Sequence, residues 1–323
     1  GTTKQQQQQQ QQQMGESGTL SCIRPRLFPF APGSRISTKV AWGNQNLFAY
    51  GCGNDVMVVD VLSGQTVCSL VGHSSEVAVV SWRPSLSLDE RDRSDCHLIL
   101  ATADVNGVVI FWNVVDSVKY FDFSPKLKAG RIRIVAWMPE DPDCVLCLSD
   151  HSLCALRVLG KRQVLWEYDF ASKEVFYGLC VDPFSSDRAV LCSSGGDVAV
   201  IQGLNSSQLP TVQERQFSLQ LGTPNNSGGA SSSSGEENFP ICQVAMSPHF
   251  RDVLYVLLRH EILLIDISLQ QQLCKLSLQQ SRSPFKQIFF SIDSKNHIFT
   301  VHEDGCISTW KLTNLTFIDY EFV

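Results

Sequence analysis

The amino-acid sequence predicts an all-β protein assembled from repeated four-stranded antiparallel sheets. Short runs rich in β-branched and aromatic residues alternate with tight polar turns along most of the chain. The same order of runs and turns recurs about every 44 to 64 residues, which fits a sheet-forming repeat that carries insertions. No stretch shows sustained helical periodicity. These observations favour sheets over helices throughout the chain.

One repeat shows the pattern clearly. Its three β-rich runs lie at 77–82, 97–102 and 108–112, and a tight turn at 104–107 separates the second run from the third. Glycine, Asn or Asp residues mark most of the equivalent turns, which lie at 53–55, 106–107, 150–151, 195–197, 259–261 and 304–305. The sequence therefore contains about six units of this kind.

A single small sheet has too little core to be stable, but stacking such sheets radially buries both of their faces. The repeat therefore predicts a β-propeller of about six recognisable four-stranded blades, with the runs 77–81, 132–136 and 241–245 as innermost strands. Such rings commonly close with seven blades. Either residues 20–37 contribute to a final blade, or the last blade is missing; we favour the missing blade.

Two low-complexity segments lie outside the repeats. Residues 1–19 contain the glutamine run 5–13 and are predicted to be a disordered polyglutamine tail, because they have no apolar face to bury. Residues 20–323 are assigned to the propeller. Within it, the Ser-, Gly- and Asn-rich segment 205–238 is predicted to be a disordered loop insertion.

Composition limits the classes of function. A net charge of −6 over 323 residues does not favour nucleic acid, which requires a basic face. No apolar run approaches the roughly 20 residues needed to cross a bilayer, and no signal-like core is seen. The 12 cysteines of so long a chain are typical of small buried hydrophobes in a reducing compartment. We expect a cytoplasmic or nuclear protein.

A Gly-His pair at Gly72-His73 and tryptophans in two of the third runs resemble the signature of the WD-repeat β-propeller family. In that family a His, a Ser or Thr of the second strand, a turn Asp and the Trp form a hydrogen-bonded tetrad inside a blade. The resemblance implies one such structural tetrad, with Asn in place of Asp, at His73, Thr102, Asn106 and Trp112. It implies three of the four members in the last unit, at Thr300, Asp304 and Trp310.

An ordered series of segments is similar to the N-terminal propeller of the WD-repeat-containing protein 11 family. These segments are 40–42, 47–52, 103–107, 261–266 and 302–307. The resemblance runs from about residue 21 to the end and omits the two insertions. It implies a subunit of a complex that tethers endosome-derived vesicles at the trans-Golgi network, with a role in ciliary Hedgehog signalling. It also implies partners that are subunits of that complex, and locations at the trans-Golgi network, cytoplasmic vesicles, the cilium base and the nucleus.

Several motifs suggest cofactors, but none carries a prediction of one. Cys144, Cys147, His151 and Cys154 have the spacing of zinc ligands, yet residues three apart on a strand point to opposite faces. Gly51-Cys52-Gly53 precedes a strand rather than a helix, so a turn is favoured over a phosphate loop. The basic residues Lys126, Lys128, Arg131 and Arg133 are interpreted as a solvated loop rather than an anionic-partner site. We predict no metal and no cofactor.

The sequence therefore favours a non-enzymatic scaffold for protein–protein interaction, with no small-molecule substrate and no direct membrane insertion. Propellers present loops from several blades on a rigid frame, which suits binding by surface complementarity. One alternative is a substrate adaptor of a ubiquitin ligase. A second is an enzyme that uses the central channel, but the apolar innermost strands offer no convergent carboxylates or histidines. The partner-binding residues stay unassigned.

Overall fold

A computed structural model describes residues 40–43, 46–84, 98–124, 131–139, 141–171, 175–204, 208–219, 241–279, 281–291, 294–313 and 316–322. Internal contacts group the chain into two units, Gly1–Ala31 and Pro32–Val323, and every described residue belongs to the second unit. All the regular elements within these ranges are β-strands. The predicted all-β fold is confirmed.

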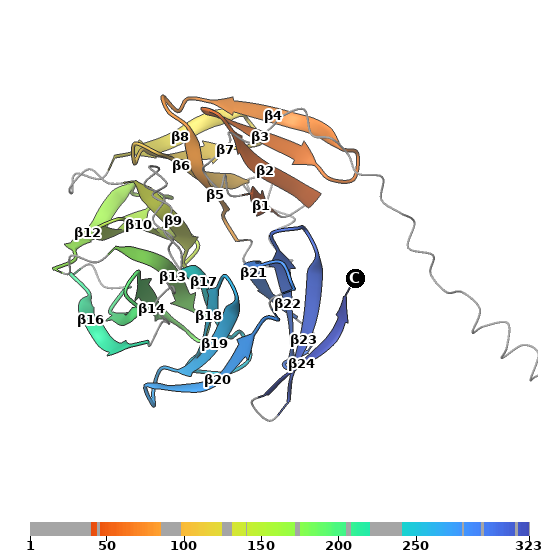
Figure 1. Cartoon of the computed structure of the whole chain (residues 1–323). Helices are drawn as coiled ribbons and strands as arrows, with labels where there is room; N and C mark the ends of the chain where they lie inside the picture. The colour runs from red at the N-terminus through yellow and green to blue at the C-terminus, as the bar shows by residue number, and fades with distance from the viewer. Residues whose placement is uncertain are drawn as a thin grey trace, which may run out of the picture. The chain divides into compact units, whose positions relative to one another are not determined.

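The described strands form six four-stranded antiparallel sheets, called blades 1 to 6, and strands adjacent in the chain are neighbours in each sheet (Figure 1). Blade 1 consists of β1 (Val40–Trp42), β2 (Leu47–Cys52), β3 (Asp55–Asp60) and β4 (Gln65–Val71). Blade 2 consists of β5 (Val77–Trp82), β6 (Ile99–Asp104), β7 (Val109–Asn113) and β8 (Val118–Phe123). Blade 3 consists of β9 (Ile132–Trp137), β10 (Cys144–Ser149), β11 (Ser152–Arg157) and β12 (Gln163–Asp169).

The other three blades repeat this order. Blade 4 consists of β13 (Phe176–Asp182), β14 (Ser185–Ser193), β15 (Asp197–Gln202) and β16 (Thr211–Ser218). Blade 5 consists of β17 (Ile241–Met246), β18 (Val253–Leu258), β19 (Glu261–Asp266) and β20 (Gln271–Ser277). Blade 6 consists of β21 (Phe285–Phe290), β22 (His297–His302), β23 (Ile307–Thr313) and β24 (Thr316–Phe322).

Burial along the strands reflects packing on both faces of the sheets. The second and third strands β6, β7 and β10 are buried at every position, whereas a sheet with one solvated face would alternate between buried and exposed residues. The outer strands β4 and β20 are mostly exposed or half-buried. The central strands therefore supply most of the core.

The turns between the second and third strands lie where the sequence predicts them. Several require a left-handed backbone that glycine adopts without steric cost, with φ of 61° at Gly53, 85° at Gly107, 88° at Gly196 and 87° at Gly305. These turns close hairpins of fixed register, so that each third strand returns its apolar residues to the same faces as the second strand.

Five hydrophobic clusters each join two consecutive blades. Representative pairs are Leu47 with Leu100, Phe111 with Val145, Leu146 with Leu191, Val190 with Val256, and Leu257 with Ile298. The first strands of successive blades also contact one another in chain order, and Figure 1 shows them toward the centre of the array. The structure is thus a series of blades in which each sheet is covered by the next.

Ion pairs add polar links across the same interfaces. Arg83 Nη2 lies 2.7 Å from Asp143 Oδ1 between blades 2 and 3. Arg188 contacts Asp252 between blades 4 and 5, and also contacts the buried Asp182 of its own blade. Because the Arg83 pair is partly exposed, it contributes less to stability than the apolar clusters do.

Part of a segment that the sequence predicts to be disordered forms a strand. The predicted disordered loop 205–238 is wrong for 211–218, which form β16 as the outer strand of blade 4. Val212 and Phe217 pack against the clusters on the two sides of this blade, and this apolar content favours a strand. Residues 205–207 and 220–238, the tail 1–19 and residues 20–37 lie outside the described residues. The described ranges contain six complete four-stranded blades.

The interface between blades 4 and 5 depends on the absence of a side chain at Gly178 in β13. A Cβ atom at this position would lie 2.2 Å from Val244 Cγ2 and 2.8 Å from Val244 Cβ. We expect Gly178→Ala to lower the free energy of unfolding by about 1–3 kcal/mol, because the core must shift to admit the methyl group. Urea denaturation measures this loss. The double variant Gly178→Ala/Val244→Ala should lose less than the sum of the two single variants, and strict additivity would contradict the clash.

Candidate functional site

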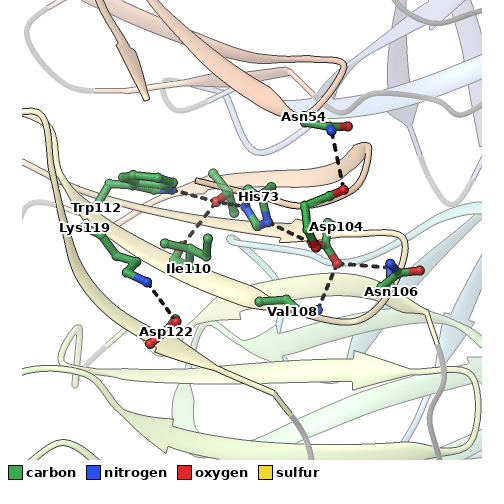
Figure 2. Close-up of polar contacts among 11 residues, drawn as sticks. Asn54, His73, Asp104, Asn106, Val108, Ile110, Trp112, Lys119 and Asp122 are labelled. Carbon is green, nitrogen blue, oxygen red and sulfur yellow. Dashed lines mark hydrogen bonds and ion pairs between the residues drawn. The ribbon is translucent and has the colours of Figure 1, made fainter. Parts of the chain in front are cut away.

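The polar network of blade 2 is the most complete buried site among the described residues (Figure 2). His73, in the loop between β4 and β5, places Nδ1 3.1 Å from Asp104 Oδ2 and Nε2 2.7 Å from Thr102 Oγ1. Trp112 Nε1 donates to Thr102 Oγ1 over 2.8 Å. The structure thus brings together three of the predicted residues, His73, Thr102 and Trp112, and adds Asp104.

The hydrogen-bond pattern identifies which ring nitrogen of His73 carries a hydrogen toward Asp104. A carboxylate can only accept, so His73 Nδ1 carries the hydrogen that Asp104 receives. Thr102 Oγ1 accepts from the Trp112 indole, and its one hydroxyl hydrogen faces two acceptors, the Ile110 carbonyl at 3.2 Å and Nε2 of a neutral His73 ring at 2.7 Å. Burial lowers the pKa of His73, although the hydrogen bond from the ring to Asp104 and the charge of Asp104 act in the opposite direction.

Asn106 does not occupy the place predicted for it in this tetrad. Its side chain is exposed in the turn, and only its backbone N–H takes part, donating to Asp104 Oδ1 over 3.0 Å. The backbone N–H of Val108 donates to the same oxygen, also over 3.0 Å. Asp104 is the acid of the network because it ends β6 and points inward, two residues after Thr102 on the same face of the strand.

Blade 6 builds a related network with another residue in the acid's place. Trp310 Nε1 donates to Thr300 Oγ1 over 2.9 Å, as expected. His302 stands two residues after Thr300, where blade 2 has Asp104, and its Nδ1 donates to the Ser283 carbonyl over 2.7 Å. Its Nε2 lies 2.8 Å from Ser308 Oγ.

The assignment of Asp304 to this tetrad is wrong. Asp304 is exposed in the turn after β22, where its Oδ1 accepts the backbone N–H of Cys306 over 2.9 Å. The signal that finds the buried member in both blades is the spacing of two residues after the Thr, which yields Asp104 and His302. Counting from the turn selects Asn106 and Asp304 instead.

The lowered pKa of His73 predicts a pH dependence of stability. Its pKa is lower in the folded chain than the unfolded value of about 6.5, so the unfolded chain binds more protons at mildly acidic pH. The stabilisation from neutral His73 is complete above about pH 6.5 and is lost as pH falls toward the folded pKa. In urea denaturation, the difference between wild type and His73→Gln should shrink from pH 7.5 to pH 5.5. The exposed His260→Gln serves as control, and an unchanged His73→Gln difference would contradict the prediction.

The cysteines that suggest a zinc site are divided between two faces of blade 3. Cys144 packs in the cluster with blade 4, whereas Cys147 and Cys154 pack in the cluster with blade 2. Burial raises the pKa of Cys144 to about 12, and hydrogen bonding with Cys147 together with burial raises the pKa of Cys154. Zinc binds thiolates, so both position and protonation oppose a shared metal.

We therefore expect elemental analysis of the purified chain to find no stoichiometric zinc. Cys147→Ser should not change the metal content, since its thiol shares no face with Cys144. One zinc ion per chain that disappears in Cys147→Ser would overturn the assignment of these thiols to the core.

The predicted basic cluster is partly engaged by its neighbours. Arg133 forms an ion pair with Asp150, and its guanidinium carbon lies 4.1 Å from the centre of the Tyr177 ring on blade 4. Lys126 and Lys128 lie outside the described residues, and Arg131 is half-buried. Arg133 thus links blades 3 and 4.

The turns between third and outer strands present apolar side chains to solvent, a feature not predicted from the sequence. Leu62, Val115 and Leu269 are 73%, 66% and 64% exposed in blades 1, 2 and 5. A preceding Asp or Asn side chain accepts the backbone N–H of each, from Leu62 to Asp60 over 2.9 Å, from Val115 to Asn113 over 3.1 Å, and from Leu269 to Asp266 over 2.9 Å. These turns are called the apolar turns.

The described residues thus combine buried hydrogen-bonded networks inside the blades with the apolar turns at the surface. The described ranges hold no group of three or more His, Cys, Asp or Glu residues that could bind a metal ion. Within the same ranges, no helix is long and apolar enough to cross a membrane. The buried networks have their hydrogen bonds satisfied within the blade, so they act on blade structure rather than on a ligand.

Comparison with known proteins agrees with this architecture. The family described as WDR11 first beta-propeller matches residues 32–316. WD repeat-containing protein 11 of Homo sapiens is 25% identical over 296 residues, which cover 83% of this chain and 23% of the relative. The protein of the same name from Danio rerio is 24% identical and is covered to 24%. The chain therefore spans about a quarter of the length of these curated relatives.

A solved structure shows the same fold. A chain of the structure titled Crystal Structure of Mitotic Checkpoint Complex superimposes with a TM-score of 0.62. The match covers 93% of this chain and 89% of that chain, at 16% sequence identity. At this identity the likeness supports the architecture alone.

Proposed function

Since the chain belongs to the WDR11 first β-propeller family, we propose that it is a non-enzymatic scaffold of a complex that tethers endosome-derived vesicles at the trans-Golgi network. Its partners are then other subunits of that complex and vesicle proteins. Its locations are the trans-Golgi network and cytoplasmic vesicles, with further roles at the cilium base and in the nucleus. The similarity to the two WD repeat-containing proteins 11 supports this assignment.

The observation that carries the scaffold role is the set of apolar turns. Burial of the exposed leucine and valine side chains against a partner would stabilise the complex, by roughly 25 cal/mol for each Å² of apolar surface removed from water. Hydrogen bonds from the backbone to Asp60, Asn113 and Asp266 hold these turns in shape before binding, which reduces the entropy lost on association. Rigid apolar points on several blades suit protein surfaces better than a small substrate.

A relocation experiment tests the proposal. The chain is anchored to the mitochondrial outer membrane of cultured cells, and endosome-derived vesicles are imaged around the mitochondria. We expect vesicles to gather there. The triple variant Leu62→Ser/Val115→Ser/Leu269→Ser should lose this capture while unfolding like wild type, because exposed substitutions usually change stability by less than about 0.5 kcal/mol.

Val71→Ser provides the matched control. Val71 is also exposed but ends the outer strand β4, away from the apolar turns, so this variant should still capture vesicles. A folded wild-type chain that gathers no vesicles would contradict the tethering role. Recovery of ubiquitin-ligase subunits in place of tethering subunits would favour the adaptor alternative.

A further inference from the structure

Two of the apolar turns, those of blades 1 and 2, place a carboxylate beside the exposed aliphatic side chain. The turn of blade 1 holds Asp60 and the exposed Leu62, and the turn of blade 2 holds the exposed neighbours Val115 and Asp116. Val118, which begins β8 directly after the second turn, is 50% exposed. Residues 60–64 and 113–118 contain no Lys or Arg, and together they are called the acidic rim.

The two parts of the acidic rim lie on one continuous surface. Cys68, in the outer strand β4 of blade 1, places Sγ 4.0 Å from the Val114 carbonyl oxygen in the turn of blade 2. Val114 belongs to the cluster between blades 1 and 2, and Cys68 packs against that cluster. β4 begins at Gln65, directly after the turn of blade 1. The blade 2 turn therefore packs on the strand that leaves the blade 1 turn, so one partner segment can contact both.

Uncharged groups orient the two carboxylates. Asp60 Oδ1 accepts the backbone N–H of Leu62 over 2.9 Å, and Asp116 Oδ2 accepts a hydrogen from the Asn113 side-chain amide over 2.6 Å. Neither donor carries a charge, so these bonds hold the carboxylates in position without neutralising them. A positioned carboxylate forms its strongest hydrogen bonds with a cationic donor such as Lys or Arg.

The corresponding turn of blade 3 has the opposite charge. Residues 157–162, between β11 and β12, include Arg157, Lys161 and Arg162 and no acidic residue. Arg157 forms an ion pair with Asp141, whereas Lys161 and Arg162 are exposed. The Arg162 guanidinium carbon lies 4.0 Å from the centre of the Tyr120 ring in blade 2. Positive charge therefore stands at the border between blades 2 and 3 and limits the acidic rim on that side.

We propose that the acidic rim binds a segment of a partner protein in which apolar side chains are interspersed with lysine or arginine. The apolar side chains of this segment cover Leu62, Val115 and Val118, and its basic side chains lie beside Asp60 and Asp116. The inference rests on the proposed scaffold role, and it names the chemistry of the partner at two of the apolar turns.

Charge complementarity selects this occupant. An acidic segment would place like charges together at the acidic rim, which opposes binding. The phosphates of nucleic acid and of anionic lipids are disfavoured for the same reason. A purely apolar segment would remove water from the two carboxylates without supplying a compensating charge. Lys161 and Arg162 repel a basic segment, which confines it to blades 1 and 2.

Defined peptides test the proposal on the purified protein. One probe is an amphipathic peptide of leucine and lysine, and the other has glutamate at every lysine position. Fluorescence anisotropy should show that the lysine peptide binds roughly tenfold more tightly than the glutamate peptide. Asp116→Asn should weaken binding of the lysine peptide about threefold, since an exposed ion pair contributes modestly. Asp116→Lys should weaken it further and should strengthen binding of the glutamate peptide.

Asp304→Asn is the matched control for Asp116→Asn. It removes the same charge from an exposed turn between second and third strands, which lies at the opposite end of a blade from the turns of the acidic rim. We expect it to leave both affinities unchanged. Equal weakening in Asp304→Asn and Asp116→Asn would show attraction by net charge alone and would overturn the proposal. Equal binding of the two peptides would also overturn it, because the apolar side chains would then act without the carboxylates.

Vesicle capture separates this inference from the proposed function. With the chain anchored to mitochondria, Asp60→Asn/Asp116→Asn should reduce vesicle capture and Asp304→Asn should not. If the wild type and Asp60→Asn/Asp116→Asn capture vesicles equally well, the scaffold role stands and the basic partner is wrong. If the wild type gathers no vesicles, the tethering role is wrong, and the peptide affinities of wild type, Asp116→Asn and Asp304→Asn decide the inference by themselves.

Discussion

Trp112→Ala should lower the free energy of unfolding by about 3–5 kcal/mol, the range for truncation of a buried aromatic side chain. Trp112 is fully enclosed in the cluster between blades 1 and 2. A Cβ atom at Gly72 would lie 2.8 Å from the Trp112 ring, so the backbone of the loop before β5 packs closely on the ring. Truncation leaves a cavity and removes the donor to Thr102 Oγ1. Equilibrium denaturation in urea measures the loss.

A second tryptophan provides the control. Trp42→Ala removes the same chemical group from an exposed position in the 323-residue chain, so its cost should fall below about 1 kcal/mol. Trp112→Phe retains part of the ring volume but not the indole donor, and should fall between the two. A loss below about 1 kcal/mol in Trp112→Ala would mean that β7 does not pack as described.

Much of this fold could be predicted because the local pattern and the tertiary arrangement agree. In blade 2, apolar and β-branched runs at 77–82 and 108–112 and the turn at Gly107 specify strands and a hairpin in isolation. Position along the repeat also identifies His73, Thr102 and Trp112, since the family signature is a spacing. By contrast, β16 was hidden in a segment whose Ser, Gly and Asn content outweighs its few apolar residues.

The parts that were mispredicted depend on register rather than composition. Asn106 and Asp104 are two residues apart and both polar, but only Asp104 lies on the strand, where its side chain points into the blade. Trp82 Nε1 donates to the Ala41 carbonyl of blade 1, and Trp137 Nε1 donates to the Ser81 carbonyl of blade 2. These contacts join residues 41 and 56 positions apart in the chain, which a repeat period alone cannot show. The apolar turns were missed because a single Leu or Val in a polar turn carries no periodic signal.

The corrected tetrad yields the second large effect. Asp104→Ala should lower the free energy of unfolding by about 3–5 kcal/mol, because several donors lose one charged acceptor and a hydrogen bond to a charged group contributes about 1.5–3 kcal/mol. Asp104 is fully buried and accepts from His73 Nδ1 and from the backbone N–H groups of Asn106 and Val108. Without the carboxylate the buried His73 Nδ1 has no acceptor in the blade, and a buried unsatisfied donor costs about 1–3 kcal/mol. The two backbone N–H groups, whose bonds to Asp104 are partly buried, lose their acceptor as well.

Asn106→Ala is the matched control, because it lies in the same turn and contributes only its backbone N–H to the network. Its side chain is exposed, so we expect its loss to cost less than about 0.5 kcal/mol. Urea denaturation of the two variants at pH 7.5 compares them directly. If Asn106→Ala lowers the free energy of unfolding as much as Asp104→Ala or more, Asn106 would be the fourth member of the tetrad, and the register of β6 and β7 would be wrong. A large loss confined to Asp104→Ala would establish that the strand-end carboxylate holds the loop from β4 to β5 against the blade.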